Sequence, residues 1–113
     1  MPTHRLVVFT EPTAGREDEY NQWYDEVHLK EVLATEGFVG AQRFALSDAQ
    51  IGDVAGAAPS RYLAIYEIEA DSLEGALEKL SAGSAKMQMS DALDTSAAKA
   101  FAYSAIGARR ESE

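Results

Sequence analysis

The sequence predicts an α+β domain in which a four-stranded antiparallel sheet carries two helices on one face, in the order β-α-β-β-α-β. Apolar, strand-length runs recur along the chain, and patterns with helical spacing follow the first and the third of these runs. A length of 113 residues suits one domain. We therefore expect residues 1–113 to form a single folding unit.

The first half of the chain supplies a strand and a helix. Residues 4–10 are apolar and β-branched, and the following Glu11-Pro12 ends this strand. The three acids of residues 17–19 favour the start of a helix. Apolar residues with the i, i+3, i+4, i+7 spacing of a helix come next, and they are Tyr20, Trp23, Tyr24 and Val27.

The helical pattern changes phase directly after this stripe. Leu29, Val32 and Leu33 form a second stripe roughly opposite the first, and one straight helix cannot bury both against the same surface. We therefore predict that the helix ends or kinks at residues 28–30 and is followed by a helical turn to about residue 35. His28 would then lie at a helix C-terminus, where the dipole favours the imidazolium form.

The second half continues the alternation of strands and helices. Gly37 ends the helical turn, and residues 38–47 form a strand whose alternation puts Phe38 and Phe44 on one face and Arg43 on the other. A Gly/Ala/Pro loop of residues 48–60 leads to a strand at 61–69. An amphipathic helix follows at 71–80, in which Asp71 and Glu74 resemble a capping box. Residues 82–96 are irregular or short helical, and the last strand spans 98–108.

Both faces of the predicted sheet are apolar, although the two helices cover only one of them. An uncovered apolar face would be a large adhesive patch, and a second copy of the chain is the simplest cover. We therefore expect a homodimer that packs through its sheet faces, with a cleft between sheet and helices in each subunit.

Composition excludes several classes of function. The formal net charge of −9 opposes binding to nucleic acid or to an anionic membrane surface. The chain has no cysteine, which rules out disulfides and thiolate chemistry. No apolar run reaches the roughly 18 residues of a membrane helix, and we expect a cytoplasmic protein. No nucleotide-binding glycine loop or full metal-ligand set is recognisable, so we expect neither a cofactor nor a metal.

The segment from Glu19 to Phe44 contains the densest set of residues able to perform chemistry. His28 is either a general acid or base, or an exposed histidine that complements the helix dipole. Arg43 either pairs with an acid, namely Glu67, Asp25 or Glu26, or holds an anionic substrate. The remaining candidates either line a ligand pocket or belong to the aromatic core and surface, and they are Tyr20, Asn21, Trp23, Tyr24, Phe44, Tyr62, Tyr66 and Tyr103.

The run N-x-W-Y-D-E-x-H-x-x-x-V-L-A-x-x-G-F-x-x-A-x-R-F, from Asn21 to Phe44, resembles the EthD-like branch of the dimeric α+β barrel superfamily. The resemblance implies a ferredoxin-like subunit and a dimer through the sheets. It also implies a small cofactor-independent enzyme of lyase, dehydratase or cyclase type. Such an enzyme would act on a hydrophobic, aromatic or polyketide-like molecule, with His28 moving a proton and Arg43 or Tyr66 stabilising oxyanion charge.

Two other functions fit the same resemblance. Relatives include monooxygenases, either cofactor-free or haem-degrading, and Asn21, Trp23 and His28 are residue types that such sites use. Other relatives resemble non-catalytic accessories of metabolic pathways, which would bind a hydrophobic small molecule without converting it.

Overall fold

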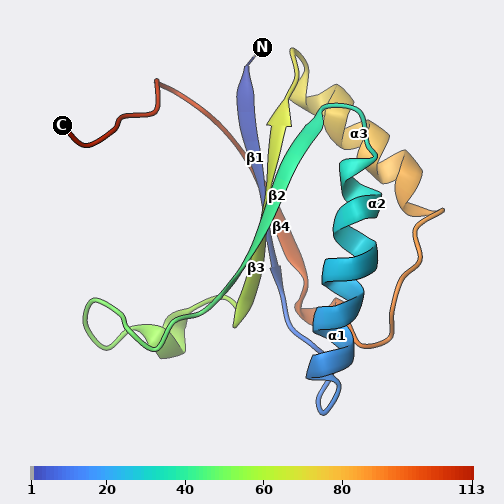
Figure 1. Ribbon diagram of the computed structural model, residues 1–113, viewed down its shortest axis with the longest axis vertical. Helices are drawn as coiled ribbons and strands as arrows, with labels where there is room; N and C mark the ends of the chain where they lie inside the picture. The colour runs from blue at the N-terminus through green and yellow to red at the C-terminus, as the bar shows by residue number, and fades with distance from the viewer. Residues whose placement is uncertain (1) are drawn as a thin grey trace.

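The computed structural model describes residues 2–113 and has the predicted order of elements. The strands β1 (Thr3–Thr10), β2 (Phe38–Ala45), β3 (Tyr62–Glu69) and β4 (Lys99–Ser104) form one antiparallel sheet in the order β2-β3-β1-β4. The helical segments are α1 (Glu17–Trp23), η1 (Tyr24–His28), α2 (Leu29–Leu33) and α3 (Leu73–Ser84), with short 3₁₀ turns η2 (Ala55–Ala57) and η3 (Thr95–Ala97). All the long helical segments lie on one face of the sheet (Figure 1).

The first helix continues through the phase break instead of ending there. Its middle, η1, is a π-helical turn in which the amide of Leu29 donates to the carbonyl of Tyr24, five residues back. The extra residue in this turn rotates α2, so that Val32 is buried like Tyr20 and Tyr24. The predicted change of phase is therefore real, but the predicted helix end at residues 28–30 is wrong. His28 lies inside the helix.

Strand β2 contains a β-bulge that changes which residues share a face. Phe38 pairs with Ile68, whereas Gly40 pairs with Glu67, so Val39 is the extra residue. Beyond the bulge the alternation is inverted, and Arg43 faces the helices together with Phe38, while Phe44 faces the other way. The prediction that Phe38 and Phe44 share a face is wrong for this reason.

Helix α3 begins and ends later than its pattern predicts. Its N-cap is Ser72, whose hydroxyl accepts a hydrogen bond from the amide of Gly75 at 2.9 Å. Ser72 therefore replaces Asp71 as the capping residue. The helix extends to Ser84, and an irregular segment then returns along the first helix to η3.

The core fills the space between the first helix and the sheet. Tyr20, Tyr24, Tyr66 and Ile68 are the largest fully buried side chains. The ring centroids of Tyr20 and Tyr24 lie 5.7 Å apart in an edge-to-face arrangement, and Phe38 contacts Tyr66 in a similar way. These aromatic contacts fix the helix on the sheet.

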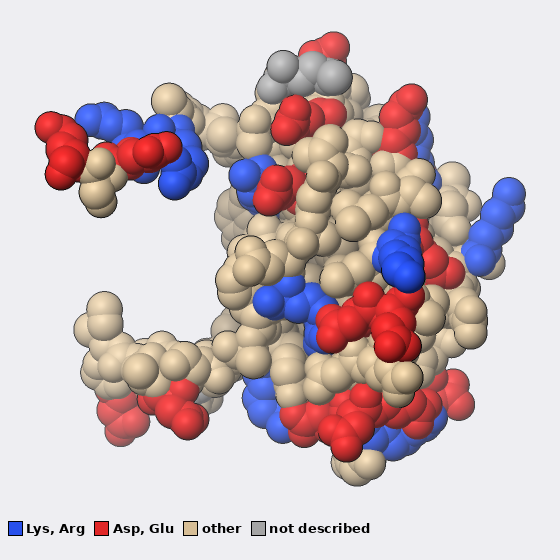
Figure 2. All heavy atoms as spheres, in the orientation of Figure 1, with Lys and Arg blue, Asp and Glu red and all other residues tan. Residues whose placement is uncertain are grey.

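The opposite face of the sheet is uncovered in the single chain. Phe44, Phe101 and Tyr103 are 42%, 49% and 62% exposed on this side. The β2–β3 loop and the C-terminal tail both project past the same face, and Figure 2 shows a hollow between them. The two projections account for a radius of gyration of 15.2 Å, above the roughly 13 Å of a compact 100-residue domain. None of the helices within residues 2–113 is long and apolar enough to cross a membrane.

Candidate functional site

His28 ends the π turn and lies against two aromatic rings. Its imidazole stacks on the indole of Trp23, with ring centroids 4.7 Å apart and planes 21° from parallel. The edge of Tyr24 closes a second side, with centroids 5.1 Å apart. The side chain of His28 remains 16% exposed, so a small molecule can still reach part of the ring. The π turn therefore presents an imidazole at the edge of an apolar wall.

One nitrogen of this imidazole faces a carboxylate. Nδ1 of His28 lies 3.8 Å from Oε1 of Glu31, one helical turn further on, and both atoms are buried without a hydrogen-bond partner. The separation is longer than a hydrogen bond. Because Nδ1 is covered, Nε2 is the nitrogen left to act on a ligand.

Burial determines the protonation of His28. Removal from water lowers the pKa of the imidazole below its ordinary value of 6.5, and the Glu31 carboxylate offsets only part of this effect. The expected imidazolium at a helix C-terminus is therefore wrong, because His28 is not at the helix end and is partly desolvated. Near neutral pH the ring is uncharged and able to accept a proton.

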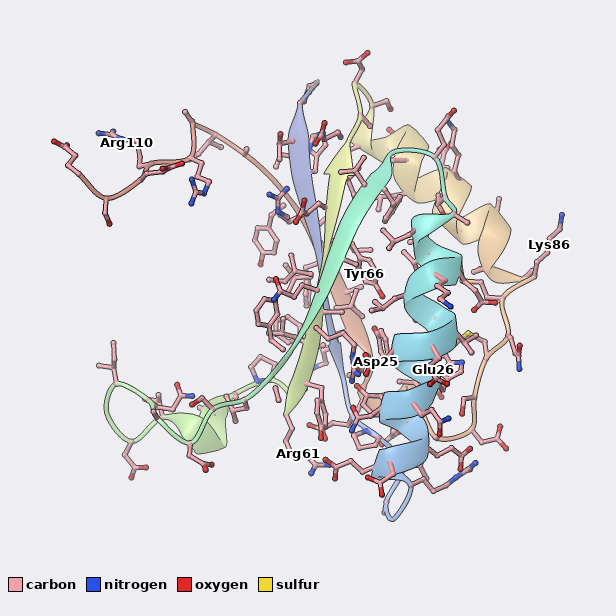
Figure 3. All side chains as sticks on the ribbon, in the orientation of Figure 1. Asp25, Glu26, Arg61, Tyr66, Lys86 and Arg110 are labelled. Carbon is pink, nitrogen blue, oxygen red and sulfur yellow. The ribbon has the colours of Figure 1, made fainter. Side chains whose placement is uncertain are left out.

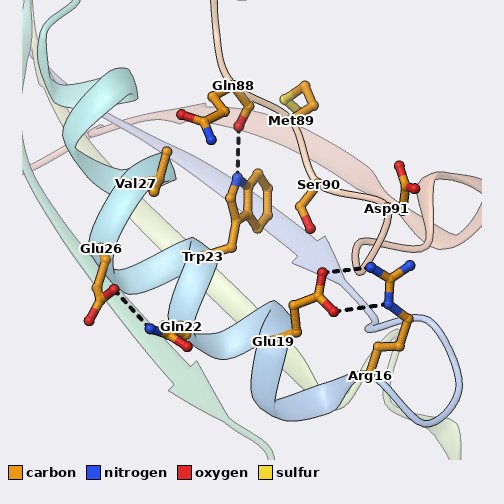
Figure 4. A pocket seen from close by; sticks show the side chains of 10 residues that line it. All are labelled: Arg16, Glu19, Gln22, Trp23, Glu26, Val27, Gln88, Met89, Ser90 and Asp91. Carbon is orange, nitrogen blue, oxygen red and sulfur yellow. Dashed lines mark hydrogen bonds and ion pairs between the residues drawn. The ribbon is translucent and has the colours of Figure 1, made fainter.

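An open groove of about 470 Å³ runs beside Trp23, between α1 and the irregular segment after α3 (Figure 4). The indole Nε1 donates to the carbonyl of Gln88 at 2.7 Å, which ties this segment to the helix. Trp23, Val27 and Met89 supply the apolar lining, and acids surround it. The charged residues are Arg16, Glu19, Glu26 and Asp91, of which Arg16 is paired with Glu19 at 2.5 Å.

Arg43 is held by groups of the protein itself. Its guanidinium donates to Asp25 Oδ1 at 2.9 Å and to Asn21 Oδ1 at 2.8 Å, and it lies 4.5 Å from the centre of the Tyr24 ring. The Arg43 side chain is 13% exposed. Of the predicted alternatives, the structure has the ion pair with Asp25, which lies between the helix and β2 (Figure 3). Asn21 serves the same arginine and does not point towards the groove that Trp23 lines.

The predicted cleft between helix and sheet is filled by tyrosines. The hydroxyl of Tyr20 bonds to Thr10, and that of Tyr66 donates to the oxygen of Tyr24 at 3.4 Å. Tyr66 is 1% exposed and points from β3 towards the helix (Figure 3). Burial raises the pKa of Tyr66 far above its ordinary value, so this phenol stays protonated. The predicted cleft is therefore closed, because side chains of the core occupy it.

Three further predicted pocket residues lie away from His28. Tyr62 faces the helices, but its hydroxyl donates to Glu17 at the start of α1. Phe44 and Tyr103 stand on the uncovered face, where the bulge in β2 and the pairing of Tyr103 with Arg5 place them. Of the two predicted alternatives, these residues belong to the surface of the sheet and do not line a cleft beside the helices.

Sequence reasoning assigned no role in the site to two groups beside His28. Glu31 carried a signal, because a carboxylate three residues after a histidine shares its helix face. The contribution of Gln88 comes from its backbone, whose amide donates to Glu31 Oε2 at 2.7 Å. A hydrogen bond from the backbone of an irregular segment cannot be predicted from residue types, because every residue except proline has the same amide. Within residues 2–113 no group of three or more His, Cys, Asp or Glu side chains could hold a metal ion.

Comparison with solved structures identifies the fold. A mutant of MhuD with manganese protoporphyrin IX bound aligns over 97% of this chain and 100% of its own, with a TM-score of 0.63 and 15% identity. An EthD-family protein from Bacillus halodurans aligns over 90% of this chain and 96% of its own, with a TM-score of 0.54 and 10% identity. The chain has the ferredoxin-like subunit fold of dimeric α+β barrel proteins. The EthD-like resemblance is thus supported at the level of fold.

Two more comparisons complete this result. The haem-degrader MhuD from Mycobacterium tuberculosis, with two haems in its active site, aligns over 95% of this chain and 99% of its own, with a TM-score of 0.58 and 16% identity. No family model matches the sequence, and no curated protein matches it. At these identities the likeness concerns the fold, so function must be argued from this chain's own residues.

The burial of His28 against Trp23 predicts a measurable pKa. We expect the imidazole of the wild type to titrate below about 6.5, and Trp23→Ala to raise the pKa of His28 towards that value because water reaches the ring. NMR titration of the imidazole ring protons measures both. Trp23→Phe is the control, since it keeps an aromatic wall, and its pKa should stay nearer the wild-type value. An unchanged pKa in Trp23→Ala would contradict this explanation.

Proposed function

We propose that the protein is a small enzyme that moves a proton on a hydrophobic small molecule, with His28 as the general base. One observation carries the proposal: an uncharged, partly exposed imidazole lies against an aromatic wall with its second nitrogen facing a carboxylate. A general base must be unprotonated at the working pH, and it works best when its pKa lies near that pH and its ring is held in place. The reaction class that fits is an elimination or cyclisation of lyase type.

In an elimination, Nε2 of His28 takes a proton from carbon. The electron pair of the broken C–H bond forms the new double bond, and the leaving group departs with the pair of its own bond. The imidazolium then returns its proton to the leaving group, which restores the neutral ring. No external oxidant or reductant is required, and we propose that no cofactor takes part.

His28 does not itself line the groove, but its stacking partner Trp23 does, and the charges around the groove favour one kind of substrate. Glu19, Glu26 and Asp91 line it against a single paired arginine, Arg16. An anionic molecule would be repelled, while Trp23 and Met89 offer apolar contact. We therefore propose a neutral aromatic or polyketide-like substrate. Arg43 and Tyr66 would hold Tyr24 in place and would not contact the substrate, since Arg43 is paired with Asp25 and Tyr66 is bonded to Tyr24.

A general base can be tested without the natural substrate. The probe is 5-nitrobenzisoxazole, whose C–H proton is removed by a base as its N–O bond breaks, releasing a coloured phenolate. We expect His28→Gln to lower this rate at least about tenfold. His4→Gln is the matched control, because both His4 nitrogens are already bonded, to Ser104 and to the Ala70 carbonyl. Equal rates for wild type and folded His28→Gln would leave a ligand-binding accessory protein as the better account.

A haem-degrading monooxygenase is the second candidate, because the solved structures with this fold include MhuD with haem bound. The residues of this chain do not fit haem. The space between helix and sheet is closed by Tyr20, Tyr24 and Tyr66, and the groove beside Trp23 is acidic, which opposes the two carboxylates of a porphyrin. Asn21 faces Arg43 instead of joining His28.

Titration with hemin separates the two candidates. We expect wild type and His28→Gln to give the same Soret spectrum, since His28 is not placed to bind a porphyrin iron. A Soret shift that appears in the wild type and disappears in His28→Gln would make the haem candidate the better one.

We also propose that two copies pack through the uncovered sheet face. The proposal is supported by the apolar residues on this face, including Phe9 and Phe101, whose rings lie 6.2 Å apart, and by the two projections that flank it. A second sheet would bury these residues and would lie in the hollow between the projections.

Light scattering after gel filtration tests the dimer. We expect the wild type to have the mass of two chains, and the double variant Phe44→Glu with Phe101→Glu to have the mass of one, because it buries two charges in the interface. Met89→Glu is the control, since Met89 is 53% exposed on the helix side, and it should remain dimeric. A monomeric wild type at micromolar concentration would contradict the proposal.

A further inference from the structure

The carboxylate of Glu31 connects two parts of the site. Its Oε2 accepts the amide of Gln88 at 2.7 Å, while its Oε1 faces Nδ1 of His28 at 3.8 Å. Gln88 is fixed a second time, because its carbonyl accepts the indole N–H of Trp23 at 2.7 Å. The backbone of one residue is thus joined to the helix on both sides of His28.

The segment that contains Gln88, residues 86–91, has no regular structure of its own. At one end the amides of Lys86 and Met87 bond to the last turn of α3, and at the other end Asp91 accepts the hydroxyl of Thr13. Within residues 2–113, this segment forms two hydrogen bonds to the first helix, and both involve the backbone of Gln88. The position of the segment over the helix therefore depends on Trp23 and Glu31.

The other carboxylate oxygen has no partner. Within the described part of the chain, residues 2–113, Oε1 of Glu31 and Nδ1 of His28 are both buried and have no hydrogen-bond partner. An unpaired buried acceptor loses the hydrogen bonds of water without replacement. Both atoms gain a partner when Nδ1 carries the proton and its N–H donates a hydrogen bond to Oε1. A small movement of either side chain shortens their separation from 3.8 Å to hydrogen-bond length. Such contacts are often long in the free protein and shorten when a ligand binds.

We propose that Glu31 is a positioning residue for His28: it holds the imidazole proton on Nδ1, which leaves the Nε2 lone pair free, and the same carboxylate fixes residues 86–91 beside the site. One side chain then sets both the tautomer of the base and the wall of the groove. This inference rests on the proposed role of His28 as a base, and it adds the residue that prepares His28 for that role.

Substitution at Glu31 separates its two functions. Glu31→Gln keeps an oxygen for the amide of Gln88 but replaces the other oxygen with an NH₂ group, which donates to Nδ1 and moves the ring proton to Nε2. Glu31→Ala removes both contacts. Glu26→Gln is the control, since Glu26 lies on the same helix and, among residues 2–113, accepts only from Gln22.

The ¹⁵N shifts of the His28 ring report the tautomer, and the amide exchange rate of Gln88 reports the attachment of the segment. We expect the Nδ1–H form in the wild type and in Glu26→Gln, and the Nε2–H form in Glu31→Gln with Gln88 still protected. In Glu31→Ala the exchange of Gln88 should accelerate on the order of tenfold, in line with a charge-assisted hydrogen bond.

The outcomes distinguish this inference from the proposed function. The same tautomer in wild type and Glu31→Gln would overturn the role of Glu31, even if His28→Gln still slowed elimination. Unchanged exchange of Gln88 in Glu31→Ala would overturn its role in fixing the segment. A tautomer that follows Glu31, in a protein whose elimination rate does not depend on His28, would overturn the proposed function alone.

Discussion

The contact between His28 and Trp23 is the interaction on which the site depends. Stacking at 4.7 Å removes one face of the imidazole from water, lowers its pKa and directs Nδ1 towards Glu31. The contact itself depends on the π turn of Tyr24–His28, which lets Tyr24 remain in the core while the indole of Trp23 bonds to the segment of residues 86–91 and His28 stacks on that indole. An irregularity of one residue in a helix therefore creates the environment of the base. Turns of this kind occur frequently at functional sites.

Much of the fold follows from the sequence alone. Four strands and two helical regions were predicted in the right order, because alternation and helical spacing report directly which side chains are buried. The errors come from single extra residues. The phase break after Val27 indicated a helix end or a kink, but a π turn also changes phase, and side-chain pattern does not distinguish these alternatives. In the same way the bulge at Val39 inverted the faces of β2, which carried Arg43 to the helices and Phe44 away from them.

The candidate site was only partly accessible to sequence reasoning. His28 and Trp23 were predicted because their residue types are chemically distinctive, and Arg43 was correctly expected to need an acidic partner. A cleft between helix and sheet was predicted, but no sequence pattern tells whether Tyr20, Tyr24 and Tyr66 surround a space or fill it, and the structure shows that they fill it. The backbone of Gln88 lay beyond prediction, because any residue type can present an amide and a carbonyl. The net charge of −9 did not indicate which surface would be acidic, whereas the structure places Glu19, Glu26 and Asp91 around the groove.

The central claim is that the fold keeps His28 unprotonated, and the pH dependence of stability tests it most directly. The pKa of His28 is lowered by folding, while the unfolded chain titrates near about 6.5. Between these two values the unfolded state binds more protons at His28, so the contribution of His28 to the free energy of unfolding decreases as pH falls below about 6.5. Urea unfolding of wild type and His28→Gln over this range isolates the contribution of His28. We expect the wild type to lose stability relative to His28→Gln on acidification. Parallel profiles, or a relative gain by the wild type, would contradict the account.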